Sequence, residues 1–562
     1  MRNKIMKKID NLVNNQIAVA AIIFFVVLLS RINIFQNQFV MDDFDFIVNW
    51  PLIQDWGNFS KFFVDYVPLP RQAGIYSPLK TLFHAVNYSL FGLKPFGYHV
   101  VSLLIHFTGI LFVYKLALYL IKDNFAAFIA GLFFAVHPLQ VESITYMTAS
   151  VDMIGIVFLF ASVYYYVLSQ DKVGQNIFNN KKYYISLLLA LIAVFTHELA
   201  ISLPVLLLWY DICFGDKKIT LSKRFMQLLP FFLIVAFYVF SKYAVLKGIT
   251  RGAYVFNSFY LTMLIIIKSL AKYVFICFLP VVLTHDHKIS EGISSFAFED
   301  FDKAAVLSQS IFDIQVVISL LILGFILWAA IRSWKDKRLI TFCMGWFFIS
   351  LLPVLNIIPS GVLFGERYLY PGLLGFCLFA GMVLRPLYAK DKLNSTVYCF
   401  WIVVIAVSFF SVRSLIRNKD WRDEVSLYES AVRANPASAL MRHDLGLVYS
   451  KAGRLDDAIA SFQSSIKLKN DDPVTFFSLG NAYQEVGQYK NAIKNFNKAI
   501  ELDREFADAY YNLAGIYAFL GHTVPSEESL KMSLDLFREQ GRTEEALELE
   551  KAFRGYFNST EK

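Results

Sequence analysis

The sequence predicts an all-α membrane protein in which a polytopic helical bundle is followed by a helical repeat domain. Of the 562 residues, 56% are hydrophobic, and the mean hydropathy is +0.49. Long apolar runs recur up to residue 412, as in transmembrane helices. After Pro436 the chain becomes charged and alanine-rich, with a 34-residue period typical of a tetratricopeptide solenoid. We therefore expect a membrane domain (1–412) with a first outer loop (36–95), a charged linker (413–435) and a repeat domain (436–562).

Eleven apolar runs are predicted to be membrane helices. They cover residues 17–35, 98–120, 125–136, 151–168, 184–195, 199–212, 227–246, 314–331, 339–353, 368–384 and 395–412. The runs 125–136 and 184–195 are shorter than the ~20 residues needed to cross a bilayer, and both end at polar tips. Broken helices at membrane depth are tolerated only where protein buries them or where they line a watery cavity. These breaks therefore indicate a site.

The basic segments set the orientation. Segments 1–8, 171–182, 217–224, 332–338 and 385–392 are rich in Lys and Arg, and the positive-inside rule places them all in the cytoplasm. Topology thus explains the net charge of +8 better than nucleic-acid binding does. The run 259–283 carries Lys268 and Lys272 on one helical face, and we expect it to be interfacial or re-entrant, because a crossing would put the last two segments outside. Four basic residues then lie outside, against the rule: Arg413, Arg417, Lys419 and Arg422.

Two further features concern the cellular compartment. The basic N-terminus before the first apolar run predicts a signal anchor, because no small-x-small cleavage site precedes Arg31. All five cysteines lie in apolar runs, which argues against a disulfide framework. We expect a multi-pass protein of a bacterial plasma membrane with its repeats on the outer side, or of the endoplasmic reticulum if the chain is eukaryotic.

This topology gathers polar residues on one outer face: Asp42, Asp43, His137, Glu142, Asp152, His197, Glu198, His285, Asp286, His287, Glu366 and Arg367. Charges at membrane depth cost roughly 2.5–3.5 kcal/mol each, so these residues are functional candidates. Each also has a structural interpretation. The aspartates can cap a helix, a lone histidine is usually a hydrogen-bonded packing residue, and Glu366 can pair with Arg367. The alternation His-Asp-His lacks the i, i+4 spacing of a helical metal site.

The repeat domain carries the 34-residue pattern three times. The recurring positions are Leu445-Gly446, Leu479-Gly480 and Leu513-Ala514, then Tyr449, Tyr483 and Tyr517, then Gly453, Gly487 and Gly521. Small residues occur where paired helices touch, and aromatic residues fill the gaps. The third copy is degenerate at Ser526 and Leu530, and residues 544–557 are predicted to form a capping helix. Such a groove suits an extended peptide, and a purely structural role is the alternative.

Five motifs occur together between residues 35 and 380. They are Phe39-Val40-x-Asp42-Asp43, Asn87-Tyr88-x-x-Phe91-Gly92, Phe134-Ala135-Val136-His137-Pro138, His197-Glu198 and Gly365-Glu366-Arg367-Tyr368. Together with the repeats, this layout resembles the transmembrane and tetratricopeptide-repeat-containing O-mannosyltransferases and their bacterial relatives, which are GT-C membrane glycosyltransferases. The resemblance implies a GT-C bundle and transfer of a sugar such as mannose from a polyprenyl-phosphate to a hydroxyl, on Ser or Thr of a protein, at the outer face.

That chemistry assigns roles to the candidates. Asp42 or Asp43 would be the general base for the acceptor hydroxyl, as the family's acid pair implies. Arg367, Lys268 and Lys272 would bind the departing phosphate. The remaining substrate-binding candidates are His137, Glu142, Asp152, His197, Glu198 and Glu366. No cofactor besides the lipid-phosphate sugar is required, and a divalent metal stays open. The alternatives are a transporter or flippase, and a non-catalytic scaffold that displays the repeats.

Overall fold

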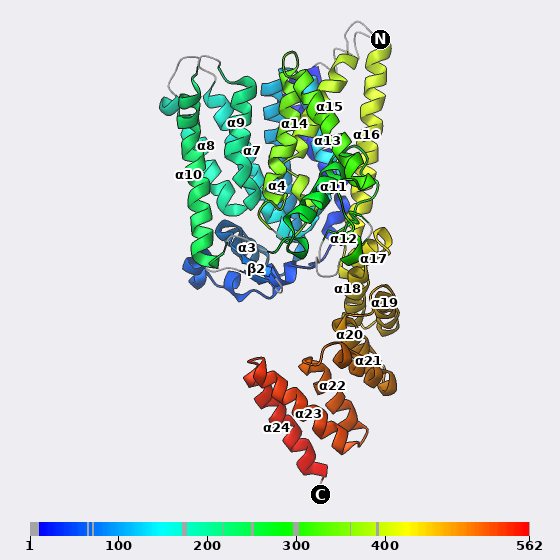
Figure 1. Cartoon of the computed structure of the whole chain (residues 1–562). Coiled ribbons are helices and arrows are strands. Elements are labelled where there is room, and N and C mark those ends of the chain that lie inside the picture. The colour runs from blue at the N-terminus through cyan, green and yellow to red at the C-terminus, as the bar shows by residue number, and fades with distance from the viewer. Residues whose placement is uncertain are drawn as a thin grey trace. The chain divides into compact units, whose positions relative to one another are not determined.

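The computed structural model describes residues 11–64, 67–69, 72–170, 177–216, 219–248, 252–290, 292–295, 303–359, 361–388 and 393–560. The chain forms two compact units, Met1–Leu427 and Tyr428–Lys562 (Figure 1). The all-α prediction is confirmed. The strands among the described residues are one antiparallel pair, β1 (Val67–Leu69) and β2 (Gln72–Ile75).

The first unit is a helical bundle. Its long helices are α2 (Gln16–Ser30), α4 (Pro95–Ile121), α5 (Asn124–Val136), α7 (Met147–Ser169), α8 (Lys181–Thr196), α9 (Leu203–Phe214), α10 (Leu221–Leu246), α11 (Phe259–Phe278), α13 (Ile314–Ser333), α14 (Arg338–Leu351), α15 (Leu373–Leu384) and α16 (Leu393–Asp420). Each of the eleven predicted runs corresponds to one of these helices. Within the described ranges, α4, α7, α10, α11, α13 and α16 are long and apolar enough to cross a membrane. The chain is therefore a multi-pass membrane protein.

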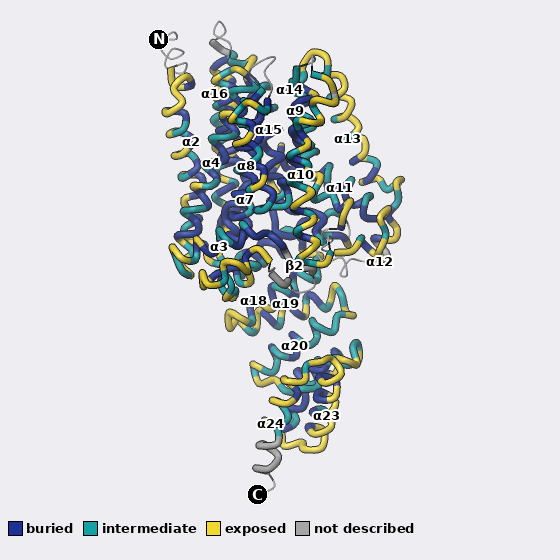
Figure 2. The backbone as a smooth tube through the Cα atoms, turned by 90° about the vertical axis from the view of Figure 1, so that its left-hand side faces the viewer, coloured by how far each residue is buried: buried dark blue, intermediate teal, exposed yellow. Residues whose placement is uncertain are grey.

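Short elements connect these helices. They are η1 (Ile32–Gln36), η2 (Phe44–Val48), η3 (Pro51–Gln54), η4 (Trp56–Phe63), α3 (Pro78–Phe91), η5 (Pro138–Gln140), α6 (Val141–Thr145), η6 (Ile177–Asn179), η7 (Glu198–Ser202), η8 (Val255–Asn257), α12 (Lys303–Leu307), η10 (Leu352–Val354), η11 (Glu366–Leu369) and η12 (Arg385–Leu387). Burial is uneven across the bundle. Figure 2 shows exposed residues along α2 and α13, whereas α7 lies in the interior.

Two helices break where the sequence predicts. Helix α5 stops at Val136, and the chain bends by 51° into η5 and α6. Helix α8 stops at Thr196, and η7 leads into α9. In both breaks a histidine caps the next turn, because His137 Nδ1 accepts from Leu139 N (3.3 Å) and His197 Nδ1 accepts from Leu199 N (3.2 Å). The short runs are therefore true helix ends, and their polar tips lie on connecting segments.

The described basic segments share one end of the bundle. Arg338 donates to Cys213 O at the end of α9 (3.5 Å), and Arg385 pairs with Asp123 before α5 (2.9 Å). This arrangement agrees with a common cytoplasmic side for 219–224, 332–338 and 385–388. Segments 1–8, 171–176, 217–218 and 389–392, which include the predicted signal anchor's basic end, lie outside the described residues.

Helix α11 has both flanks at the opposite end. Before the helix, Tyr254 OH donates to Ile357 O (2.9 Å), and after it Thr284 N donates to Glu366 Oε1 (2.7 Å). Ile357 and Glu366 both belong to the connection between α14 and α15. Although α11 is long and apolar enough to cross, these contacts favour the predicted interfacial or re-entrant placement.

The predicted linker is wrong in its first half. Helix α16 continues through Arg413 to Asp420, and Arg417 and Trp421 are completely buried. Arg417 pairs with Glu366, and Trp421 packs against Tyr146 at 5.5 Å between ring centroids. Residues 413–427 therefore belong to the membrane unit. Their charge suggested a solvated segment, but the charge of Arg417 is compensated inside the protein.

The second unit consists of paired helices. It begins within α17 (Glu424–Ala434) and continues with α18 (Ala439–Lys451), α19 (Leu455–Leu468), α20 (Pro473–Glu485), α21 (Tyr489–Leu502), α22 (Ala507–Phe519), α23 (Thr523–Glu539) and α24 (Thr543–Thr560). A Cβ added at Gly480 would lie 2.6 Å from the Phe496 ring, which explains the small residue at that repeat position. Gly487 has φ +75° in the turn between α20 and α21, a conformation that favours glycine. Pro525 is tolerated because it lies in the first turn of α23.

Candidate functional site

The predicted polar residues of the outer face meet at one end of the first unit. Asp43 contacts Thr148 at the start of α7, Arg367 contacts Glu142 in α6, and Glu366 contacts Arg417 near the end of α16. Residues separated by more than two hundred positions are thereby brought together.

The two adjacent aspartates have different environments. Asp43 is completely buried, and its carboxylate accepts hydrogen bonds from Val40 N (3.1 Å), Thr148 N (2.7 Å) and Thr148 Oγ1 (2.7 Å). Asp42 is half-buried. Of the two predicted candidates for the base, Asp43 is therefore not open to solvent, because the loop turns its carboxylate inward to tie residues 40–43 to α7.

Burial also changes the acidity of Asp43. It raises the pKa of the Asp43 carboxyl to about 7, while the hydrogen bonds from Thr148 and Val40 oppose this rise. The same burial, together with the carboxylates of Asp42 and Asp43, raises the pKa of the Tyr146 hydroxyl well above its ordinary value. Tyr146 therefore lies beside both aspartates and stays protonated at neutral pH.

Arg367 is one of the cations predicted to bind the departing phosphate. Its Nη1 lies 3.0 Å from Glu142 Oε1, and its guanidinium carbon lies 6.0 Å from the centre of the Tyr146 ring. Although burial opposes the charge, the neighbouring Tyr368, Glu142, Tyr146 and Asp42 hold the pKa of Arg367 well above its usual range. Arg367 thus carries its charge near Glu142 and the half-buried Asp42.

Glu366 does not pair with Arg367, so the predicted structural alternative for these two residues is wrong. Its carboxylate accepts from His287 Nε2 (2.8 Å) and Thr284 N (2.7 Å), and lies 3.4 Å from Arg417 Nε. Burial raises the pKa of Glu366, and Arg417 opposes this effect. Adjacent residues in a 3₁₀ turn point in different directions, which is why Glu366 and Arg367 serve two separate ion pairs.

A second group surrounds Asp152. Lys80 Nζ lies 2.9 Å from Asp152 Oδ1, and His197 Nε2 lies 3.6 Å from Asp152 Oδ2. Asp152, His197 and Arg367 line a common small cavity of about 10 Å³, roughly the room that one water needs. Glu198 pairs with Lys242 at 2.7 Å. The structure thus brings Asp152 and His197 toward Arg367, while Glu198 is occupied by a lysine of α10.

Two predicted substrate contacts are corrected. His137 Nε2 donates to Cys277 O (3.0 Å), and its Nδ1 caps the following turn, so both ring nitrogens have protein partners. Lys268 is buried against Gln309 and Asp313, with the latter at 3.5 Å. His137 is therefore a packing residue, and Lys268 holds the start of α13 instead of a phosphate.

Lys272 lies nearer to the site than Lys268. Its Nζ donates to Lys288 O (2.5 Å) and lies 5.4 Å from the centre of the Phe364 ring. The same Phe364 ring contacts His287. The two lysines share a helical face in the sequence, but they contact different segments.

His285 and His287 belong to the His-Asp-His alternation noted in the sequence. Across the described part of the chain, no group of three or more His, Cys, Asp or Glu side chains is arranged to hold a metal ion. Burial, with help from Arg367, Arg417 and His287, lowers the pKa of His285 to about 3. Asp286 Oδ1 accepts from Ser295 N (3.0 Å), which fixes the loop.

The prediction missed three charged residues of the site: Lys80, Lys242 and Arg417. Arg417 had a visible signal, because it violates the positive-inside rule at the outer end of a membrane helix. The physical explanation for that violation is a buried partner, because Glu366 compensates the charge of Arg417 inside the protein. Lys80 and Lys242 gave no such signal, since each lies in an amphipathic context that is common at helix ends.

This chain is similar to several known proteins. The tetratricopeptide (TPR) repeat family matches residues 446–487 and 485–521. A protein O-mannosyl-transferase of Caenorhabditis elegans is 24% identical over 438 residues, covering 75% of this chain and 58% of the relative. The resemblance to these transferases is confirmed. Protein O-mannosyl-transferase Tmtc3 of Drosophila melanogaster is 23% identical over 454 residues, covering 69% and 48% of the two chains.

The solved structures include a chain with weak similarity to this one. The archaeal oligosaccharyltransferase AglB from Archaeoglobus fulgidus is 13% identical, with a TM-score of 0.42 over 74% of this chain and 56% of that chain. The chain spans about half the length of the curated relatives it matches.

Proposed function

We propose that this chain is a membrane glycosyltransferase. It transfers a sugar, such as mannose, from a polyprenyl-phosphate donor to a hydroxyl of Ser or Thr in a protein at the outer face. Similarity to protein O-mannosyl-transferases over 75% of the chain supports the reaction class. The site supports the same class, because its charged groups lie at one end of the bundle instead of along a conduction path.

The observation that carries the proposal is the proximity of Asp42 and Arg367. Asp42 is half-buried, so its carboxylate can receive a proton from a substrate that arrives from solvent. Arg367 lies close enough for Asp42 to stabilise its charge. A base and a cation that both lie near Tyr146 form the pair that transfer from a phosphate leaving group requires.

The reaction assigns each group one task. The acceptor oxygen forms a bond to the anomeric carbon while the bond from that carbon to the phosphate oxygen breaks. The phosphate leaves with the bonding electrons, and Asp42 takes the proton of the hydroxyl. Arg367 stabilises the charge that develops on the leaving phosphate, for which its planar guanidinium offers two parallel donors. A positioned base of this kind typically contributes about 10²–10⁴-fold to the rate.

Neighbouring residues position these two groups. Asp43 fixes the loop that carries Asp42 by its three hydrogen bonds. Glu142 orients Arg367 through their 3.0 Å contact. Asp152 and His197, which share a cavity with Arg367, are placed to hydrogen-bond the hydroxyls of the donor sugar. We assign the TPR repeats to capture of the polypeptide acceptor.

The test is an assay of the purified full-length protein in lipid nanodiscs. It uses radiolabelled mannosyl-phosphoryl polyprenol and a short peptide rich in Ser and Thr. We expect the Asp42→Asn variant to lose at least about 100-fold in kcat, whereas Asp45→Asn, an exposed acid three residues away, keeps its rate. Transfer by Asp42→Asn at the wild-type rate would contradict the assigned base. No transfer by the wild-type protein to any hydroxyl acceptor would favour a scaffold.

A further inference from the structure

The residue directly before the proposed base has a strained backbone. Met41 has φ 53°, in the left-handed region that residues other than glycine rarely adopt. Such a conformation persists only where the surrounding structure fixes the chain on both sides. After Met41 the fixed point is Asp43, which accepts two hydrogen bonds from Thr148 in α7. A second fixed point is therefore required before Met41.

The end of α16 supplies that second fixed point. Gln38 N donates to Arg422 O (2.8 Å), just after the last turn of this helix. Asn37 is buried, and its Nδ2 donates to Asn418 O (3.0 Å) within that turn. We call residues 33–43, which carry the proposed base, the base segment. The base segment is thus held by α16 before its strained residue and by α7 after it.

Asn418 joins the end of α16 to the rest of the bundle. Its side chain is completely buried, and both ends of its amide have partners. Its Nδ2 donates to Asn33 Oδ1 (3.2 Å) at the start of the base segment, and its Oδ1 accepts from Thr145 Oγ1 (2.5 Å) at the end of α6. Asn33 Nδ2 in turn donates to Leu415 O (2.9 Å). These bonds fix the end of α16 and the base segment against α6.

Apolar packing connects the same elements. Trp421, three residues after Asn418, is completely buried and stacks on Tyr146 with 5.5 Å between ring centroids. Val40 of the base segment belongs to the same buried cluster as these two rings. Tyr146 in turn neighbours Asp42. A shift of the end of α16 would therefore move the surroundings of Asp42 as well.

We propose that Asn418 is a positioning residue for the transfer reaction, and that it acts by holding Asp42 in place for the acceptor hydroxyl. The inference rests on the proposed function and adds a role for the end of α16. Without the amide of Asn418, the end of α16 loses its tie to α6, and Met41 can relax from its strained conformation. A displacement of about 1 Å at a catalytic group can cost roughly 10²-fold in rate. Because Asn418 is completely buried, we expect its effect to pass through the base segment.

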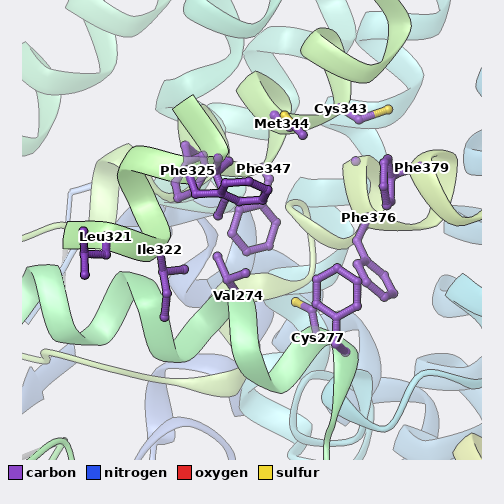
Figure 3. A pocket seen from close by; sticks show the side chains of 14 residues that line it. Val274, Cys277, Leu321, Ile322, Phe325, Cys343, Met344, Phe347, Phe376 and Phe379 are labelled. Carbon is purple, nitrogen blue, oxygen red and sulfur yellow. The ribbon is translucent and has the colours of Figure 1, made fainter. Parts of the chain in front are cut away.

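The apolar groove beside α13 is separate from this network. It has a volume of about 570 Å³ and lies between α11, α13, α14 and α15 (Figure 3). Its fourteen lining residues all belong to these four helices. A substitution of Asn418, which lies in α16, therefore changes none of the side chains that line the groove.

A double-mutant cycle measures whether Asn418 acts through Asp42. The full-length wild type, Asn418→Ala, Asp42→Asn and the double variant are compared in nanodiscs, with the radiolabelled donor and the short peptide. In the wild-type background, we expect Asn418→Ala to lower kcat about tenfold and to change both KM values less than about twofold. In the Asp42→Asn background, it should lower kcat less than about twofold, because a missing base cannot be displaced. An equal loss in both backgrounds would overturn the inference.

Ser414→Ala is the matched control on the same helix. Ser414 lies one turn before Asn418, is equally buried, and donates to Val136 O (2.9 Å) at the end of α5. It makes no printed contact with the base segment, so kcat should stay within about twofold of the wild type. A loss of kcat in Ser414→Ala as large as that in Asn418→Ala would show general loosening of α16, and would contradict a specific positioning role.

Hydrogen exchange gives a readout that does not depend on activity. We expect peptides that cover residues 36–43 to exchange at least about tenfold faster in Asn418→Ala than in the wild type, and to stay protected in Ser414→Ala. Asn37→Ala cuts the contact from the other side, so it should give the same faster exchange and serves where Asn418→Ala does not fold. Wild-type exchange in both asparagine variants would overturn the inference.

The outcomes separate this inference from the function on which it rests. If Asp42→Asn transfers sugar at the wild-type rate, the assigned base fails, and the positioning role fails with it. If Asp42→Asn is impaired but the loss from Asn418→Ala is the same in both backgrounds, only the positioning role fails. If transfer by Asp42→Asn is too slow to measure, the hydrogen-exchange comparison decides.

Discussion

Replacement of Asp43 tests whether its carboxylate anchors the loop that carries Asp42. Asp43→Ala leaves three buried donors without an acceptor: Val40 N, Thr148 N and Thr148 Oγ1. Each unsatisfied donor costs about 1–3 kcal/mol, so the variant should lose at least about 3 kcal/mol of stability. Asp43→Asn keeps an acceptor oxygen for Thr148 and should lose only about 1–2 kcal/mol. The exposed Asp45→Ala should be neutral within about 0.5 kcal/mol.

The same residue predicts a pH dependence. The pKa of Asp43 is raised from 3.8 to about 7 by burial, so the folded state binds this proton more tightly than the unfolded chain. The contribution of Asp43 to stability is therefore full at low pH and declines as the pH rises from about 4 to about 7. At 1.36 kcal/mol for each pH unit, the decline amounts to about 4 kcal/mol. Asp43→Asn has no such decline.

The assay is thermal unfolding of the purified proteins in detergent, followed by tryptophan fluorescence at pH 5 and pH 8. The wild-type unfolding temperature should fall more between these pH values than that of Asp43→Asn. Asp43→Ala should unfold several degrees below the wild type at pH 5, and this difference should narrow at pH 8, because only the wild type loses stability as Asp43 ionises. A wild-type unfolding temperature for Asp43→Ala would show that the loop is not held by this carboxylate and would refute the reasoning.

Three further predictions address other parts of the chain. Arg367→Lys should raise the donor KM and lower kcat at least about tenfold, and Arg367→Ala should nearly abolish transfer, because a lysine lacks the planar fork; normal donor kinetics in a well-expressed variant would contradict this role. Gly480→Ala should destabilise the repeats by about 1–3 kcal/mol through its clash, whereas Gly515→Ala, which meets no atom within 4 Å, should stabilise them by about 0.5–1 kcal/mol; calorimetry checks the opposite signs. A chain truncated after Asn435 should still modify a short peptide at high concentration but lose most activity on a long polypeptide at low concentration; equal activity on both would exclude acceptor capture.

The helical architecture could be predicted because it depends on local patterns. Apolar runs define membrane helices through the cost of exposing polar backbone to lipid, and all eleven predicted runs are helices in the structure. The 34-residue period predicted the repeats, since Gly480 must be small wherever Phe496 packs against it. The breaks after Val136 and Thr196 could also be located, because polar tips follow apolar runs that are too short.

The partners within the site could not be predicted, because they depend on tertiary burial. Asp42 and Asp43 are equivalent in sequence, and only the fold turns one of them inward toward Thr148. Charge along the chain suggested a solvated linker at Arg417, yet Glu366, 51 residues earlier, compensates that charge in space. Ion pairing between distant segments leaves no periodic trace in a single sequence.

The central claim is that this chain glycosylates proteins at the outer face and that Asp42 is its base. The most direct measurement is glycopeptide mass spectrometry of outer-compartment proteins from cells that express the wild type, Asp42→Asn or the matched Asp45→Asn at equal levels. We expect hexose on Ser or Thr with the wild type and Asp45→Asn, and its loss with Asp42→Asn. Equal hexose occupancy in all three, or in cells without the chain, would contradict the claim.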